Sequence, residues 1–205
     1  MNRYYFEEQL WQEGYKRIMG LDEVGRGCVC GPVVASGVII KPGCRLNPEI
    51  TDSKKLTAAQ REKLAVEIKE KALFWTIQEM SPKVIDRQNI LNASIKAMIN
   101  CSEEKGANPD YLLVDGNRFT ASLIQHTCIV KGDDKSASIA AASILAKVYR
   151  DKYMYELHDK YPYFGWDCNV GYPTKKHFEG LSEYGYTKHH RKSFKLRTSK
   201  IFDEK

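Results

Sequence analysis

The stretch Gly20-Leu21-Asp22-Glu23-Val24-Gly25-Arg26-Gly27 ends an apolar segment with two adjacent carboxylates and continues into a glycine-flanked arginine. Two carboxylates this close repel each other, so one of their pKa values rises unless a cation neutralises the pair. A divalent metal or a basic partner would supply that cation, and both indicate a working site. We interpret the stretch as the end of a strand in an α/β sheet, where functional sites gather.

The composition is that of a globular protein with one well-buried domain. The chain has 205 residues, of which 42% are hydrophobic and 28% are charged, which is ordinary for a soluble domain. Its formal charge of +6 fits a polyanionic partner, although many proteins without such a partner share this balance. The first residues do not resemble a secretion signal, and no apolar run approaches the roughly 18 residues of a membrane helix. We therefore expect a cytoplasmic monomer with no membrane partner.

The cysteines lack the spacing of a disulfide framework or a zinc site. The chain has 6 cysteines, and only Cys28 and Cys30 are close together, without a neighbouring Cys or His. We interpret them as small buried side chains in a reducing compartment.

Hydrophobic patterning predicts a mixture of strands and helices. We expect strands over residues 15–23, 32–40, 73–80, 111–116 and 126–130, and helices over 4–13, 57–71, 82–105, 136–158 and 174–185. The glycine-rich turn after the first strand favours an antiparallel pair with the second. The short, apolar fourth strand is typical of a buried parallel position. This order predicts a mixed α/β domain over residues 1–160 and a helical, basic C-terminal extension over residues 161–205.

Acidic residues follow three of the predicted strands. Asp22 and Glu23 close the first strand, Asp115 closes the fourth, and Asp133 and Asp134 follow the fifth. If the first and fourth strands are neighbours, their acids meet at one edge of the sheet. Oxygen ligands without His or Cys suit Mg²⁺ or Mn²⁺. Two such ions activate a water and stabilise the leaving oxygen of a phosphodiester.

Each group of acids also has a purely structural interpretation. Asp115-Gly116-Asn117 alone is typical of a turn, and Asp133 and Asp134 would complement the dipole of the helix that follows them. The first pair of acids would be a solvated strand end paired with Arg26. These interpretations must account separately for acids that all follow core strands, whereas a metal site accounts for them together.

The acidic stretch is the first of seven motifs that occur in unbroken order between about Arg17 and Phe194. The others are Asp52-Ser53-Lys54-Lys55-Leu56, Val114-Asp115-Gly116-Asn117, Lys131-Gly132-Asp133, the run SIAAASILAKV at 138–148, Gly171-Tyr172-Pro173-Thr174 and His190-Arg191-Lys192-Ser193-Phe194. Together they resemble the bacterial ribonuclease HII family, one of the type 2 ribonucleases H. The resemblance implies a ribonuclease H-like fold with a mixed five-stranded sheet flanked by helices and a small helical C-terminal extension.

The resemblance also implies an activity. The expected enzyme is an endoribonuclease that cleaves the RNA strand of RNA–DNA hybrids and incises 5′ of single ribonucleotides in duplex DNA. Two-metal-ion hydrolysis with Mg²⁺ or Mn²⁺ would leave 3′-hydroxyl and 5′-phosphate ends. By motif match, the metal-binding catalytic carboxylates are Asp22, Glu23, Asp115 and Asp133. We choose Asp133 over Asp134 because the family pattern places its acid directly after glycine. No replication partner is identified.

Substrate contacts are expected at the turn after the first strand. Telling RNA from DNA requires sensing the 2′-hydroxyl. Gly25 and Gly27 would let the main chain approach a sugar, and Arg26 can hold a phosphate. By resemblance, this turn is the ribonucleotide sensor and Tyr172 packs on the sugar at the RNA–DNA junction. Without the resemblance, we would interpret Tyr172 as a core or turn aromatic.

Basic residues complete the expected substrate surface. Lys54 and Lys55 are expected to contact phosphates, and so are Arg191 and Lys192 in the basic segment that begins at Thr187. A solvated lysine pair and a solubilising chain end are the structural alternatives.

Two other functions stay open. A non-catalytic binder of RNA–DNA hybrids would be better served by neutral or basic residues than by four acids. An enzyme like ribonuclease HIII would lack its usual N-terminal domain here, and that family tends to have threonine where this chain has Arg26.

Overall fold

The computed structural model describes residues 2–120 and 123–194, and a five-stranded sheet in the order β3-β2-β1-β4-β5 lies at its centre. Its strands are β1 (Ile18–Val24), β2 (Val33–Ile39), β3 (Phe74–Met80), β4 (Tyr111–Asp115) and β5 (His126–Ile129). β2 pairs antiparallel with both β1 and β3, whereas β4 pairs parallel with β1 and β5. The predicted mixed five-stranded sheet, with its first and fourth strands adjacent, is therefore confirmed.

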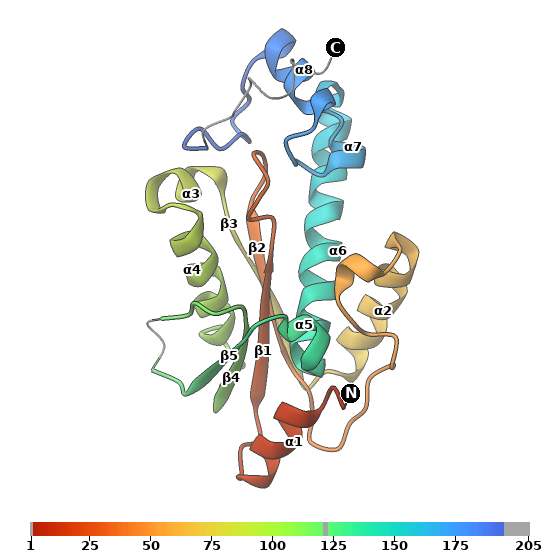
Figure 1. Cartoon of the computed structure of the whole chain (residues 1–205), viewed down its shortest axis with the longest axis vertical. Helices are drawn as coiled ribbons and strands as arrows, with labels where there is room; N and C mark the ends of the chain where they lie inside the picture. The colour runs from red at the N-terminus through yellow and green to blue at the C-terminus, as the bar shows by residue number, and fades with distance from the viewer. Residues whose placement is uncertain (1, 121–122, 195–205) are drawn as a thin grey trace.

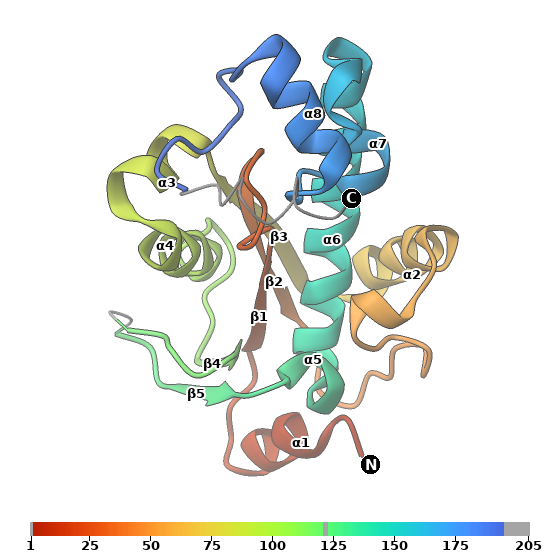
Figure 2. The ribbon, with the colours of Figure 1, turned by 45° about the horizontal axis from the view of Figure 1, so that its top comes forward.

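Helices cover both faces of this sheet (Figure 1). The helix α4 (Ile90–Ser102) packs on one face, while α6 (Ala137–Lys160) packs on the other and separates the sheet from α2 (Ala58–Lys71) (Figure 2). The shorter helices are α1 (Tyr5–Gln12), α3 (Pro82–Gln88), α5 (Gly132–Lys135), α7 (Trp166–Asn169) and α8 (Lys175–Tyr184), with 3₁₀ turns η1 (Ser53–Lys55) and η2 (Pro162–Phe164). Within the described residues, no helix has both the length and the apolar character required to cross a bilayer.

Alternation along β1 sends its side chains to two different cores. Met19 and Leu21 join the buried cluster that includes Ala93 and Ala97 of α4. Gly20 lies on the opposite face, where an added Cβ would overlap the main chain of α6 at Ser138. Because Gly20 has no side chain, α6 packs directly against this face of β1. Asp22, two residues further along the strand, projects from the same face.

The N-terminus of α6 is held by α1. Glu7 is fully buried, and its Oε1 accepts hydrogen bonds from the Ser138 main-chain N–H (2.9 Å), the Ser138 hydroxyl (2.7 Å) and the Ser136 hydroxyl (2.6 Å). Ser136 is itself the N-cap residue of α6. A carboxylate at this position satisfies free N–H groups and complements the helix dipole.

The structure differs from the predicted elements at several places. The helix expected over residues 82–105 is divided into α3 and α4 by Asn89, whose φ is +66° and whose side chain accepts a hydrogen bond from Asn92 N–H at the start of α4. Asn is one of the few residues that tolerate a positive φ, so the helix can break at this position. The short helices α5 and α7 were not expected, and β1 begins at Ile18 rather than at residue 15. The Thr57–Gln60 capping box is present.

The cysteine prediction needs one correction. Cys28, Cys30 and Cys101 are buried and Cys44 and Cys128 are partly buried, but Cys168 is exposed. It lies on α7, a single surface turn, where its thiol contacts Asp167.

The chain after α6 returns to the connection between β1 and β2 (Figure 1). The Val29 N–H donates to the Gly171 carbonyl, the Gly31 N–H to the His189 carbonyl and the Arg191 N–H to the Val29 carbonyl, each at 2.9 Å. Segments near residues 170 and 190 thus flank residues 28–31 on both sides. The boundary at residue 160 stays a prediction, and residues 195–205 of the basic tail lie outside the described residues.

Candidate active site at the ends of strands β1 and β4

The parallel ladder between β1 and β4 ends just before two of the acids. Leu21 pairs with Val114 in that ladder, so the following residues, Asp22 within β1 and Asp115 at the end of β4, lie at the same place in the sheet. The Asp115 Oδ1 atom accepts a hydrogen bond of 2.7 Å from the Gly132 main-chain N–H. This bond brings the start of α5, and with it Asp133, to the same place.

One cavity opens there, and all four acids predicted to bind metal line it. The same cavity includes the predicted sensor turn, a lysine from η1, a tyrosine from the loop before α8 and three polar residues that the sequence did not single out. Its lining includes Asp22, Glu23, Asp115, Asp133, Gly25, Arg26, Gly27, Lys54, Tyr172, Ser53, Ser143 and Lys147.

Burial and mutual repulsion raise the pKa values of three of the four acids. Burial raises the pKa of Asp22 well above its usual range, and the charges of Glu23 and Asp115 raise it further. Burial also raises the pKa of Glu23, although the Arg26 guanidinium opposes this effect. The pKa of Asp133 rises to about 6 through burial and then through the charges of Asp115 and Asp52. The cavity therefore holds more negative charge than its protein partners neutralise.

The donor set fits divalent ions that prefer oxygen. Carboxylates surround one cavity in which their charge is only partly compensated, as Mg²⁺ or Mn²⁺ requires. In this conformation, however, no three His, Cys, Asp or Glu side chains within the described residues are arranged to hold an ion. Two of the acids are hydrogen-bonded to protein groups here: Glu23 pairs with Arg26, and Asp115 accepts from Gly132. Side-chain rotation would have to bring these oxygens together.

Arg26 and Glu23 form the ion pair at the mouth of the cavity. Arg26 Nη1 lies 3.0 Å from Glu23 Oε1, and the side chain of Arg26 is 49% exposed whereas that of Glu23 is 10% exposed. Arg26 is therefore paired with Glu23 and exposed to solvent at the same time. In this position its guanidinium could leave Glu23 and bind a phosphate of the substrate.

The two lysines of the Asp52-Ser53-Lys54-Lys55 motif have different surroundings. Asp52 accepts a hydrogen bond of 2.9 Å from the Lys54 main-chain N–H and so fixes η1, from which Lys54 lines the cavity. Lys55 forms an ion pair with Asp134. Because this pair holds Asp134 to η1 while Asp133 lines the cavity, the structure separates the roles of the two neighbouring acids.

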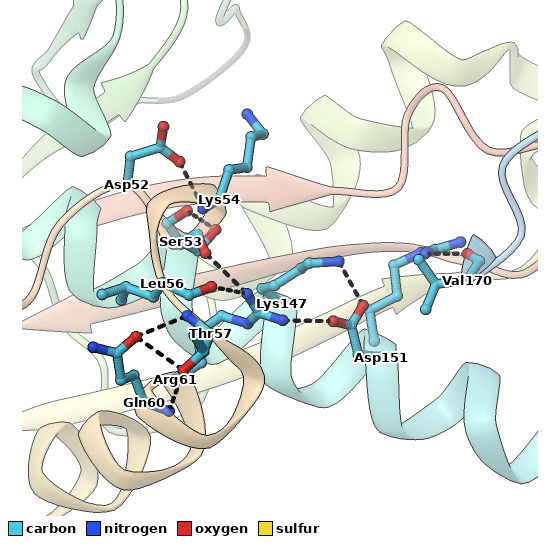
Figure 3. A network of polar contacts seen from close by, with 12 residues as sticks. Asp52, Ser53, Lys54, Leu56, Thr57, Gln60, Arg61, Lys147, Asp151 and Val170 are labelled. Carbon is cyan, nitrogen blue, oxygen red and sulfur yellow. Dashed lines mark hydrogen bonds and ion pairs between the residues drawn. The ribbon is translucent and has the colours of Figure 1, made fainter. Parts of the chain in front are cut away.

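The sequence reasoning missed a group of polar residues on α6. Lys147 lines the cavity, and its Nζ lies 2.7 Å from Asp151 Oδ1, while Arg61 of α2 reaches Asp151 Oδ2 at 3.4 Å (Figure 3). Ser143, one turn before Lys147, has its Oγ 3.0 Å from Ser53 Oγ, and its hydroxyl opposes the rise in the pKa of Asp22. The spacing of 143, 147 and 151 places all three on one helical face, and this was the signal available in the sequence.

Tyr172 stands beside the sensor turn. A Cβ added at Gly27 would lie 3.5 Å from Tyr172 Cε1, in ordinary van der Waals contact. The Tyr172 hydroxyl lies near the buried Cys28 thiol. The side chain is nevertheless 42% exposed. Its ring is thus held at the edge of the cavity with surface left for a ligand.

Two buried arginines support the sensor turn from behind. Arg150 of α6 donates to the carbonyls of Pro32 (2.9 Å), Val170 (2.9 Å) and Cys30 (3.0 Å). Arg191 is 1% exposed and donates to the carbonyls of Gly31 (2.9 Å) and Arg26 (3.2 Å). Arg191 was expected to contact a phosphate, but here its guanidinium binds main-chain oxygens of the turn instead.

Lys192 differs from its neighbour. It is exposed, and its main-chain N–H donates at 3.1 Å to Asp86 of α3, which also accepts from Ser193. Asp86 thereby fixes the segment that carries Lys192 on the outside of the molecule.

Comparisons with known proteins show what this chain is similar to. The family model for ribonuclease HII matches residues 19–197. Ribonuclease HII of Salinibacter ruber is 47% identical over 194 residues, which cover 93% of this chain and 96% of that protein. The structure of the PCNA:RNase HII complex from Archaeoglobus fulgidus contains a chain that matches with a TM-score of 0.76 at 28% identity, over 88% of this chain and 96% of that one.

A structure of Bst-RNase HIII in complex with Mn²⁺ shares the fold, with a TM-score of 0.63 at 17% identity over 93% of this chain and 70% of that one. The match to ribonuclease HII thus extends to sequence over nearly the whole chain, whereas this likeness to ribonuclease HIII concerns the fold alone. The chain therefore belongs to the ribonuclease HII family, whose members are ribonucleases that act on RNA–DNA hybrids.

Proposed function

We propose that this enzyme cuts the RNA strand of hybrids and also incises 5′ of single ribonucleotides in duplex DNA, leaving 3′-hydroxyl and 5′-phosphate ends. One observation carries the proposal: the acids and the sensor turn come from separate motifs and line a single cavity. Cutting and sensing at one ribonucleotide require both groups within the span of about one nucleotide.

Asp22, Glu23, Asp115 and Asp133 are the residues that would hold two divalent ions, Mg²⁺ or Mn²⁺. Bound there, such ions supply an activated water and stabilise the leaving oxygen. The protein's own contribution is to keep four acids together in a partly buried cavity. The pKa values of Asp22, Glu23 and Asp133 are raised first by burial and also by neighbouring acids, which shows that holding these charges there without a cation is costly.

Recognition of ribose would take place between the sensor turn and Tyr172. Gly27 leaves its main chain open on the side that faces the Tyr172 ring. A sugar between them would meet main-chain polar groups on one side and an aromatic surface on the other. Only RNA offers a 2′-hydroxyl to those main-chain groups.

The cations of the site have separate tasks in this proposal. Arg26 releases Glu23 and holds a phosphate of the cut strand with its planar guanidinium. Lys54 and Lys147 line the same cavity and add positive charge close to the acids. Lys192 contacts the nucleic-acid backbone at the periphery of the site. Lys55 does the same only when its ion pair with Asp134 is broken.

The test is a gel assay with a DNA duplex that contains one ribonucleotide, with and without Mg²⁺ or Mn²⁺. We expect a nick on the 5′ side that requires the ion. Asp22→Asn should abolish cleavage and preserve or strengthen binding of the duplex, because a repulsive charge is removed. Asp134→Asn is the matched control, since Asp134 is paired with Lys55, and it should retain cleavage.

Turnover by Asp22→Asn at the normal rate would contradict the metal-binding role. Binding without cleavage by the unaltered enzyme, at any ion concentration, would favour the non-catalytic hybrid binder instead. The Archaeoglobus fulgidus relative was solved in a complex with PCNA, but the described residues of this chain support no particular protein partner.

A further inference from the structure

Two buried histidines lie behind Tyr172. His177 belongs to the first turn of α8 and His190 to the segment that pairs with Cys30, and their side chains are 0% and 2% exposed. Their Nε2 atoms are 3.0 Å apart. Two imidazoles in this arrangement form a hydrogen bond only if one Nε2 carries a proton and the other does not.

The surrounding partners assign the proton positions. The Thr187 main-chain N–H donates to His190 Nδ1 at 3.0 Å, so the proton of neutral His190 is on Nε2 and is donated to His177. His177 Nε2 also accepts from Trp166 Nε1 at 3.2 Å, which places the His177 proton on Nδ1. That proton is donated to the Tyr172 carbonyl at 2.9 Å. A directed chain of hydrogen bonds thus runs from Thr187 to Tyr172.

These hydrogen bonds, together with two main-chain contacts, hold the main chain of Tyr172 on both sides. On one side, the Gly171 carbonyl accepts from Val29 in the connection that follows the sensor turn. On the other, the Tyr172 carbonyl is held by His177, and His190 is tied to Cys30 by a β-bridge. Both ends of the tyrosine's main chain are therefore fixed relative to residues 28–31, directly after Gly27.

Both imidazoles are in the neutral form that this chain requires. Burial lowers the pKa of His177, and burial followed by the charge of His177 lowers the pKa of His190 to about 4. Burial of two neutral histidines is costly unless each ring nitrogen has a partner, and every ring nitrogen of this pair has one.

We infer that His177 and His190 are positioning residues that set the location of Tyr172 over the sensor turn. Among the described residues, the one hydrogen bond from their side chains to a residue of the cavity is that of His177 with the Tyr172 carbonyl, so we expect their effect on the reaction to pass through Tyr172. The inference rests on the proposed role of Tyr172 in incision at a single ribonucleotide. A role confined to fold stability is the alternative, and it makes a different prediction for combined variants.

A double-mutant cycle separates the two possibilities. His177→Phe keeps an aromatic ring and removes the bond to Tyr172, which should lower the rate of incision at a single ribonucleotide by about tenfold, the value of one buried hydrogen bond. Added to Tyr172→Ala, the same change should cause no further loss, because residues that act through one another are not additive. His177→Gln retains a donor and an acceptor and should recover part of the rate.

His189→Phe is the matched control. His189 neighbours His190, but its ring packs against Tyr161 at 5.6 Å, so we expect a rate within about twofold of the unaltered enzyme. All rates are compared at a temperature at which circular dichroism shows each variant to be folded. If His177→Phe does not fold, the comparison is made with His177→Gln and His190→Gln.

The outcomes are distinguishable. An undiminished rate for Tyr172→Ala alone would refute the role proposed for Tyr172. If Tyr172→Ala lowers the rate but the histidine change lowers it by the same factor again in the double variant, positioning through Tyr172 is refuted and the pair is structural. Loss of the histidine effect in the Tyr172→Ala background supports the inference.

Discussion

At the scale of single residues, the two glycines of the sensor turn are required for different reasons. Gly25 has a φ of +91°, and a Cβ there would overlap the side chain of Arg150. Gly27 has no such backbone requirement, and its added Cβ would only touch Tyr172. Gly25 therefore belongs to the architecture of the turn, and Gly27 to the surface that the turn presents.

This difference predicts opposite behaviour for the two alanine variants. Gly25→Ala should lower the free energy of unfolding by at least about 1–3 kcal/mol, because it adds backbone strain and displaces a buried guanidinium. Gly27→Ala should unfold like the unaltered protein but incise a single ribonucleotide about tenfold more slowly, because the new methyl group stands where a sugar must approach. Thermal melts and the nicking assay measure the two effects. Normal incision by Gly27→Ala would mean that substrate does not approach this glycine closely.

At the scale of elements, hydrophobic period predicted all five strands and most helices, because burial on one or two faces dictates that period. It did not predict the break at Asn89 or the turn of helix at α5. Both depend on a single residue with positive φ, Asn89 at +66° and Lys131 at +56°, and not on the apolar pattern. Lys131 is an unusual residue for that conformation, so its role at the start of α5 is visible only in three dimensions.

The anchoring of α6 by α1 yields a test of element stability. Glu7→Ala removes the acceptor for Ser136 and Ser138, and we expect a loss of about 1.5–3 kcal/mol, the value of hydrogen bonds to a buried charged group. Glu8→Ala is the control, because Glu8 forms a partly exposed ion pair with Arg45 and should cost less than about 1 kcal/mol. Urea denaturation measures both. Equal losses would show that the buried carboxylate does not hold the N-terminus of α6.

At the scale of the whole molecule, the sequence motifs predicted four acids that the structure brings to one cavity, and the structure adds the residues that support this candidate site. Asp22, Glu23, Asp115 and Asp133 line one cavity, as a single anionic site requires. Arg150 and the His177–His190 pair could not be recognised in advance, because Arg150 binds main-chain carbonyls at least 20 residues away and the two histidines bond each other across 13 residues. Sequence separation conceals such contacts, whereas acids at strand ends share a recognisable position.

The site and the histidine pair affect stability in opposite directions as pH changes. The folded-state pKa of Asp133 is raised from 3.8 to about 6, so the folded protein retains a proton that the unfolded chain has lost, and stability falls as pH rises through this window. The folded-state pKa of His190 is lowered from 6.5 to about 4. Here the unfolded chain binds the extra proton, and stability rises as pH rises through nearly the same window.

We therefore expect Asp133→Asn to remove the opposing effect of Asp133, so that the pH dependence of stability contributed by His190 becomes measurable. Without ions, the stability of this variant should rise more steeply between pH 4 and pH 6 than that of the unaltered protein. At pH 7 the variant should be the more stable protein by about 1 kcal/mol, a value reduced for solvent screening because Asp133 is only half-buried, or about 2–4 °C in melting temperature. Asp134→Asn is again the control: the Lys55 ammonium lowers the pKa of Asp134, so its removal should bring no gain at pH 7. Parallel profiles for Asp133→Asn and the unaltered protein would show that Asp133 does not carry the charge repulsion of the cavity.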